Sequence, residues 1–309
     1  MKIKTLWNSI TPFNNRQDVP TAFYVIKKVL GFLFIYAAAA FVGEAVIIGA
    51  LLIMGYDPLN GILPVGHLAE LLKYYGFVGF LLVAVFYCKL VEKRSLKSIG
   101  FNGNVYDLFT GCLAAVLLLA IIVGLCCATG ALEFVGVASG VNVPYLIALF
   151  GAFFVQSMAE EVMSRGFLFK SLSKRASMPV AIIVSAAAFS MGHLASVLEA
   201  EGWFTVIGVV NLFLVSAVFA LLYHLRANIY IVGGLHCLWN FLLYGVMGLS
   251  ISGSAGNENA LLQFRVPAAN ILNGGVYGME AGIITTAVLT ITVAILAAMR
   301  HKRRDDNGV

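Results

Sequence analysis

The sequence alternates between long apolar stretches and mostly short polar segments. The apolar stretches lie at about 25–54, 74–91, 106–130, 144–170, 178–198, 203–224, 228–249 and 277–299. Most are close to the ~20 residues that an α-helix needs to cross the hydrocarbon core of a bilayer. The longest polar segment, about 250–275, is expected to be an external loop. The pattern predicts an all-α polytopic membrane protein with about eight transmembrane helices, and residues 1–309 as one integral membrane domain.

Composition supports a membrane protein. Hydrophobic residues make up 61% of the chain and charged residues 11%, whereas a soluble domain carries about 25% charged residues. The formal net charge is +5, but no groove of interleaved basic and aromatic residues is visible. We therefore expect membrane lipid, and no nucleic acid, among the partners.

Basic residues test the topology independently. If the N-terminus is cytoplasmic, 17 of the 20 Lys and Arg residues fall on the cytoplasmic side. They are Lys2, Lys4, Arg16, Lys27, Lys28, Lys89, Lys93, Arg94, Lys97, Lys170, Lys174, Arg175, Arg226, Arg300, Lys302, Arg303 and Arg304. The positive-inside rule produces this asymmetry. It predicts a multi-pass protein of the cell membrane with both termini in the cytoplasm.

The stretch at 144–170 contains an unusual charged group, Glu160, Glu161 and Arg165. A charged side chain at the centre of a membrane helix costs about 2.5–3.5 kcal/mol on insertion scales, so such residues indicate function. Residues four apart share a helix face, which predicts an ion pair between Glu161 and Arg165. Glu160 is offset by about 100° and is left for chemistry. The alternative is a charge network that only holds helices together.

Two later stretches each carry a histidine. His193 follows Phe189 by one helical turn, and His236 and Asn240 share a face at a four-residue spacing. His236 and Asn240 can both donate hydrogen bonds, which suits the stabilisation of an oxyanion. The alternatives are a packing histidine at position 193 and interhelical hydrogen bonding by the other pair. Trp239 is expected to point elsewhere and to pack.

The motifs of several protease classes are absent from the sequence. The sequence has no HExxH zinc motif, no GxSxG serine motif and no pair of intramembrane aspartates. Glu44, in the first apolar stretch, is a further buried carboxylate to which the sequence assigns no role.

The ordered combination of these motifs resembles the CAAX protease and bacteriocin-processing enzyme family. The motifs are Glu160-Glu161-x-x-x-Arg165, Phe189-x-x-x-His193 and His236-x-x-x-Asn240, all within about 155–245. The eight-span layout is also similar to that of the family.

The resemblance implies an intramembrane endopeptidase that cleaves a membrane-associated peptide or protein. Glu160 would act as general base on a water molecule that His193 helps to position. His236 and Asn240 would stabilise the oxyanion, and Glu161 with Arg165 would support the site. The family has also been described as metalloproteases, in which case Glu160, His193 and His236 could bind Zn²⁺. We favour a mechanism that requires no cofactor.

Two rival functions remain. One is a non-catalytic membrane scaffold or bacteriocin self-immunity protein that keeps the charged network for packing. The other is a transporter, which is disfavoured because the sequence shows no inverted repeat. Sequence leaves open the substrate, the metal dependence and the oligomeric state.

Overall fold

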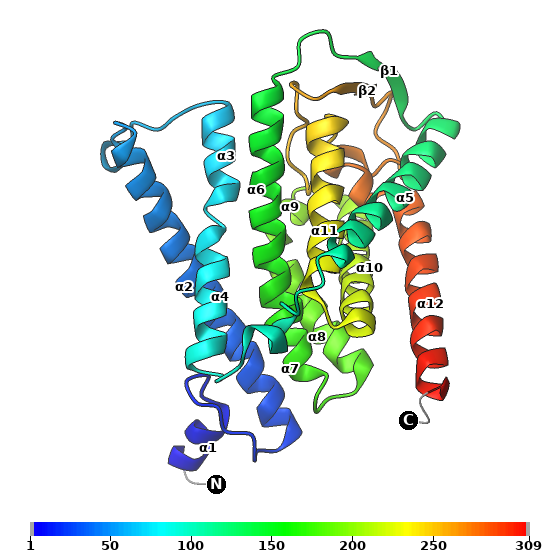
Figure 1. The fold of residues 1–309 in the computed structure, drawn as a ribbon. Coiled ribbons are helices and arrows are strands. Elements are labelled where there is room, and N and C mark those ends of the chain that lie inside the picture. Colours follow the sequence, from blue (N-terminus) through cyan, green and yellow to red (C-terminus); the bar gives the residue numbers. More distant parts are fainter. Residues whose placement is uncertain (1–2, 307–309) are drawn as a thin grey trace.

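The computed structural model describes residues 3–306 and is a bundle of helices with one small sheet (Figure 1). The helices are α1 Ile3–Ile10, α2 Thr21–Ile53, α3 His67–Tyr75, α4 Val78–Leu90, α5 Tyr106–Ala128, α6 Val143–Glu161, α7 Lys170–Leu172, α8 Met178–Met191, α9 Leu194–Leu198, α10 Gly202–Arg226, α11 Ile229–Asn240 and α12 Ile283–Asp306. Two π-helical segments follow α6 and α11, namely η3 Val162–Phe169 and η4 Phe241–Val246. Short 3₁₀ turns are η1 Pro58–Asn60, η2 Leu96–Ile99, η5 Gly275–Tyr277 and η6 Met279–Ala281.

Within the described residues, seven helical segments are long and apolar enough to cross a membrane. They are Thr21–Ile53, His67–Leu90, Tyr106–Ala128, Val143–Leu172, Gly202–Arg226, Ile229–Val246 and Ile283–Arg303. The protein is therefore an all-α polytopic membrane protein, as predicted. The predicted stretch at 178–198 differs, because it forms the 14-residue helix α8 and the short helix α9 instead of one long helix. The chain turns between them at Gly192 and His193.

Helix α11 lies in the centre of the bundle and is held closely against α5. A Cβ atom added to Gly111 of α5 would lie 2.0 Å from the carbonyl oxygen of Ile231. One added to Gly234 of α11 would lie 2.4 Å from the carbonyl oxygen of Leu108. Small residues allow helix backbones to approach in this way inside membranes, where packing replaces the hydrophobic drive for association. The two glycines thus fix the position of the helix that carries His236.

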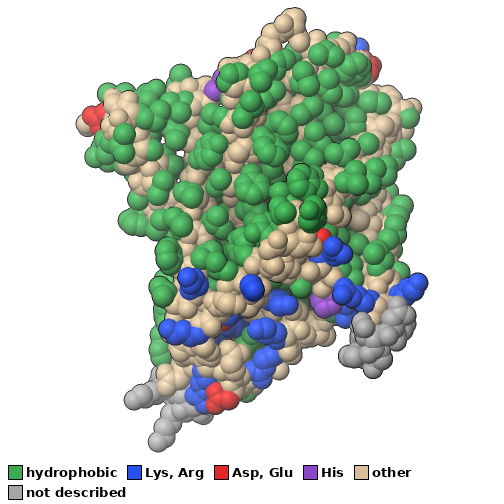
Figure 2. Space-filling model, viewed as in Figure 1, with side chains coloured by type: hydrophobic (Ala, Val, Ile, Leu, Met, Phe, Trp, Pro, Cys, Tyr) green, Lys and Arg blue, Asp and Glu red, His purple; other side chains and the backbone are tan. Residues whose placement is uncertain are grey.

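Most of the basic side chains visible in Figure 2 gather at one end of the molecule. Both ends of the described chain lie at that end, and the sheet lies at the opposite end (Figure 1). Lys2 is outside the described residues, and the side chains of Lys4 and Arg304 are not described. The shared location of the two ends agrees with an even number of crossings. That this end faces the cytoplasm stays a prediction.

The segments at the end opposite the termini contain structure that hydropathy did not predict. Strand β1 (Glu133–Val137) pairs antiparallel with β2 (Leu262–Arg265), which lies inside the expected loop at 250–275. The last apolar stretch was expected from 277, but α12 begins only at Ile283. The turns η5 and η6 precede it, with Gly278 between them at φ 97°, a conformation that favours glycine and interrupts a helix.

Candidate active site

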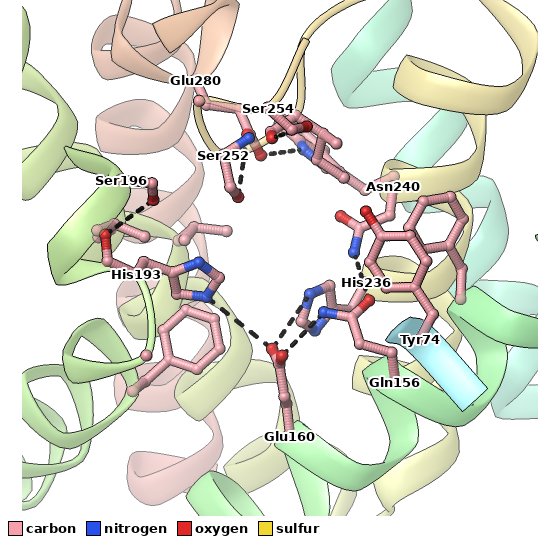
Figure 3. A pocket seen from close by; sticks show the side chains of 18 of the residues that line it. Tyr74, Gln156, Glu160, His193, Ser196, His236, Asn240, Ser252, Ser254 and Glu280 are labelled. Carbon is pink, nitrogen blue, oxygen red and sulfur yellow. Dashed lines mark hydrogen bonds and ion pairs between the residues drawn. The ribbon is translucent and has the colours of Figure 1, made fainter. Parts of the chain in front are cut away.

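Three elements bring four of the predicted site residues around one point. Glu160 lies at the end of α6, His193 at the α8–α9 turn, and His236 and Asn240 on α11. Oε2 of Glu160 lies 4.0 Å from Nε2 of His193 and 3.8 Å from Nε2 of His236 (Figure 3). The α8–α9 turn, which replaces a continuous helix, is what places the His193 ring opposite Glu160.

These residues line a cavity of about 440 Å³. Its walls include residues from α3, α6, α10 and α11, the α8–α9 region and the segment Ile251–Ser254. The side chains of Glu160 and His193 are 16% and 17% exposed, and that of His236 is 8% exposed. The carboxylate and both rings are thus largely shielded yet reachable from the cavity, as expected for groups that react with a bound substrate.

Gln156 connects two of the predicted residues, and sequence reasoning did not select it. Its Nε2 donates a hydrogen bond to Oε1 of Glu160 at 2.8 Å, and its Oε1 accepts one from Nδ2 of Asn240 at 3.0 Å. Gln156 is one helical turn before Glu160, so the four-residue spacing was the available signal. The link holds one carboxylate oxygen, while Oε2 of Glu160 has no hydrogen-bond partner among the described residues.

Glu161 forms the predicted ion pair and also orients a histidine. Its Oε1 lies 3.0 Å from Nη1 of Arg165 and 3.0 Å from Nδ1 of His236. Arg165 also donates to the hydroxyl of Ser216 on α10 at 2.6 Å. A carboxylate at Nδ1 fixes the orientation of an imidazole and leaves Nε2 to act. Here that atom faces Glu160.

Two phenylalanines enclose the buried arginine and flank the histidines. The guanidinium of Arg165 lies 4.5 Å from the ring centre of Phe189 and 4.9 Å from that of Phe219. Phe219 stacks on His236 at 5.2 Å, and Phe189 lies 5.0 Å from His193. A cation between desolvated aromatic faces is stabilised by about 2 kcal/mol per contact. The rings therefore help to offset the burial of Arg165, which is 0% exposed.

A comparison with protein families matches the segment that carries this site. Residues 142–242 match the Rce1-like family of type II CAAX prenyl endopeptidases. The match covers about a third of the chain and contains all the motif residues. The family resemblance predicted from the motifs is confirmed, and the family indicates a peptidase. None of the curated proteins that were compared matches the chain.

Both π-helical segments directly follow site residues. Segment η3 begins immediately after Glu161, and η4 begins immediately after Asn240. π-Helical turns are rare and occur mostly at functional sites, because the wider turn re-aims the neighbouring side chains. Regular helix was expected at both places, since hydropathy does not distinguish the two forms.

The side chains that could bind a metal at this site are those of Glu160, His193 and His236. Among residues 3–306, no group of three or more His, Cys, Asp or Glu is arranged to hold a metal ion. The zinc candidates Glu160, His193 and His236 face one another, but their closest N···O separations are 3.8–4.0 Å. Nδ1 of His236 is engaged by Glu161, which leaves Nε2 to face either a water molecule or a metal ion. The metal dependence of the site therefore stays a prediction.

Trp239 and Glu44 lie in places that the sequence did not predict. Trp239 was expected to point away, but it lines the cavity and its Nε1 donates to Oε1 of Glu280 at 3.0 Å. The expectation failed because the indole reaches a partner in η6, which is distant in sequence. Glu44 was expected to be buried, which is wrong: it is exposed and lines a second, more apolar cavity of about 590 Å³ beside α2 and α3. Lys73 and Phe77 line both cavities.

Proposed function

We propose that the protein is an intramembrane endopeptidase that hydrolyses a peptide bond in a membrane-associated peptide or protein. One observation carries the proposal. A carboxylate oxygen without a hydrogen-bond partner among the described residues, Oε2 of Glu160, faces two imidazoles that line the same cavity, between helices long and apolar enough to cross a membrane. The position of this oxygen on the cavity wall, beside two imidazoles that line the same cavity, is what supports a catalytic role over a network that only holds helices together.

The distances suit a water-activating pair. Separations of 3.8–4.0 Å are too long for direct hydrogen bonds and suit a bridging water molecule. Glu160 takes a proton from that water while His193 orients it, and the oxygen attacks the carbonyl carbon of the scissile bond. Glu160 then returns the proton to the leaving nitrogen as the C–N bond breaks. General acid–base catalysis of this kind contributes about 10²–10⁴-fold to a rate.

The oxyanion formed in the attack needs hydrogen-bond donors. Asn240 has two N–H groups on Nδ2, of which one binds Gln156 and the other can point to the cavity. His236 donates from Nε2 when its ring carries both protons, a form that the carboxylate of Glu161 at Nδ1 stabilises. Removal of one such donor from an oxyanion site costs about 10²–10³-fold in kcat.

Substrate, cofactor and orientation belong to the same proposal. The family description supports a prenylated CAAX tail as the first substrate to test, and bacteriocin leaders and peptide pheromone precursors are the alternatives. We expect cleavage without a metal, and we expect both termini in the cytoplasm of a cell with the protein in its cell membrane. Residues 1–309 would act as one membrane domain.

The test uses purified full-length protein in detergent micelles and a fluorescence-quenched peptide that ends in a prenylated CAAX sequence. The variants Glu160→Gln and His193→Ala should remain folded and lose at least about 100-fold in kcat. The controls Glu258→Gln and His224→Ala alter exposed residues of the same types away from the cavity. Cleavage that is equally fast in all four variants would favour the non-catalytic scaffold or immunity protein.

A further inference from the structure

Glu280 occupies the end of the cavity opposite Glu160 and lies outside the family-matched segment (Figure 3). Both of its carboxylate oxygens are used. Oε1 accepts the hydrogen bond from Nε1 of Trp239 at 3.0 Å, and Oε2 accepts one from the backbone N–H of Ser252 at 2.6 Å. One side chain thus joins helix α11 to the segment Ile251–Ser254.

The two hydrogen-bond partners of Glu280, Trp239 and Ser252, both line the cavity. Trp239 is 6% exposed and directly precedes Asn240, at the point where α11 changes to the π-helical segment η4. Ser252 has φ 49°, in the left-handed region that a serine seldom adopts. Such a backbone conformation persists only where surrounding contacts determine it. The bond from its N–H to Glu280 is one of those contacts.

The turn that carries Glu280 is itself fixed. The amide of Asn211 on α10 donates to the carbonyl oxygens of Glu280 at 2.8 Å and Gly282 at 3.1 Å. The hydroxyl of Thr286 on α12 donates to Oδ1 of Asn211 at 2.8 Å. Asn211 is 3% exposed. Glu280 is therefore attached to two membrane helices and can serve as a fixed reference for the residues that it binds.

We propose that Glu280 is a positioning residue of the active site, which holds Asn240 through Trp239 and closes the cavity through Ser252. The role rests on the proposed peptidase function. It requires a carboxylate, because two N–H donors from different elements each need an acceptor oxygen. A glutamine offers one oxygen and an NH₂ group, so one of the two donors would face another donor.

The kinetic test compares Glu280→Gln with Glu258→Gln, which changes an exposed carboxylate between η4 and α12, the same part of the chain. With the prenylated quenched peptide, Glu280→Gln should lower kcat about tenfold or more and leave KM within about twofold, because displaced oxyanion donors affect the transition state most. Trp239→Phe removes the same hydrogen bond from the other side, and Trp203→Phe is its control at a 74% exposed tryptophan.

The double variant separates positioning from general destabilisation. If Glu280 acts through Trp239, then Glu280→Gln combined with Trp239→Phe should be within about twofold of Glu280→Gln alone. A loss of kcat in the double variant equal to the product of the two single losses would show that Glu280 does not act through Trp239. Unchanged kcat in Glu280→Gln, in protein that remains folded, would overturn the proposal.

A second measurement does not depend on peptidase activity. Hydrogen exchange of the segment 249–256, followed by mass spectrometry, reports on the stretch of backbone that contains the N–H of Ser252. Exchange should be at least about fivefold faster in Glu280→Gln than in wild type and unchanged in Glu258→Gln. Absence of any peptide cleavage that depends on Glu160 would refute the proposed function. Equal exchange in the two variants would refute the proposal that Glu280 holds the backbone at Ser252.

Discussion

Replacement of Gly111 by alanine tests whether close contact between α5 and α11 sets the geometry of the site. The added Cβ would lie 2.0 Å from the carbonyl oxygen of Ile231 and 2.9 Å from the nitrogen of Leu235. Ordinary contact begins at 3.4 Å, so the helices must separate by about 1.4 Å locally. Overpacking of a core typically costs about 1–3 kcal/mol. Since the clash is with backbone, we expect the upper end of that range.

The same displacement should also lower the rate of catalysis. Because α11 carries His236 and Asn240, a shift of about 1 Å moves two groups that face Glu160, and misplacement on that scale can cost about 100-fold in rate. Initial rates with the quenched peptide and thermal unfolding in micelles measure the two effects. The control is Gly124→Ala on the same helix, where an added Cβ meets nothing within 4 Å among the described residues. Equal rates and equal unfolding temperatures for the two alanine variants would refute the reasoning.

Three further predictions concern the polar network. Arg165→Met should destabilise the protein by about 3–5 kcal/mol, because the buried carboxylate of Glu161 loses its arginine and keeps only His236. Chemical denaturation measures this, and a loss below about 1 kcal/mol would contradict it. Gln156→Leu should lower kcat at least about tenfold, since Glu160 and Asn240 both lose a hydrogen bond, and a change confined to KM would argue against that link. Chelation should leave the cleavage rate of the purified enzyme unchanged, with metal content measured in parallel; activity lost on chelation and restored by zinc would favour the metalloprotease alternative.

The candidate site could be chosen from the sequence because ionisable residues are so few in the apolar stretches. Glu160, His193 and His236 stand out in a chain with 11% charged residues, and a spacing of four residues was enough to pair Glu161 with Arg165. Hydropathy also gave seven of the membrane-spanning segments, because the bilayer demands long apolar helices.

The features that the sequence did not reveal depend on tertiary contacts. Gln156 is a neutral polar residue, and its importance comes from neighbours on two helices. The bond from Trp239 to Glu280 joins residues 41 positions apart. The π-helical segments, the α8–α9 turn and the pairing of β1 with β2 also arise from packing between distant parts of the chain, which no local pattern encodes.

The shortness of α8 has a consequence for the surrounding lipid. A helix of 14 residues covers about 21 Å, whereas the hydrocarbon core is about 30 Å thick. Met191 and Leu194, on either side of the turn that follows, are 53% and 47% exposed. A bilayer adapts to such hydrophobic mismatch by thinning locally. We therefore expect acyl-chain length to affect the cleavage that we propose, since a thinner leaflet beside His193 would shorten the path of water to the scissile bond.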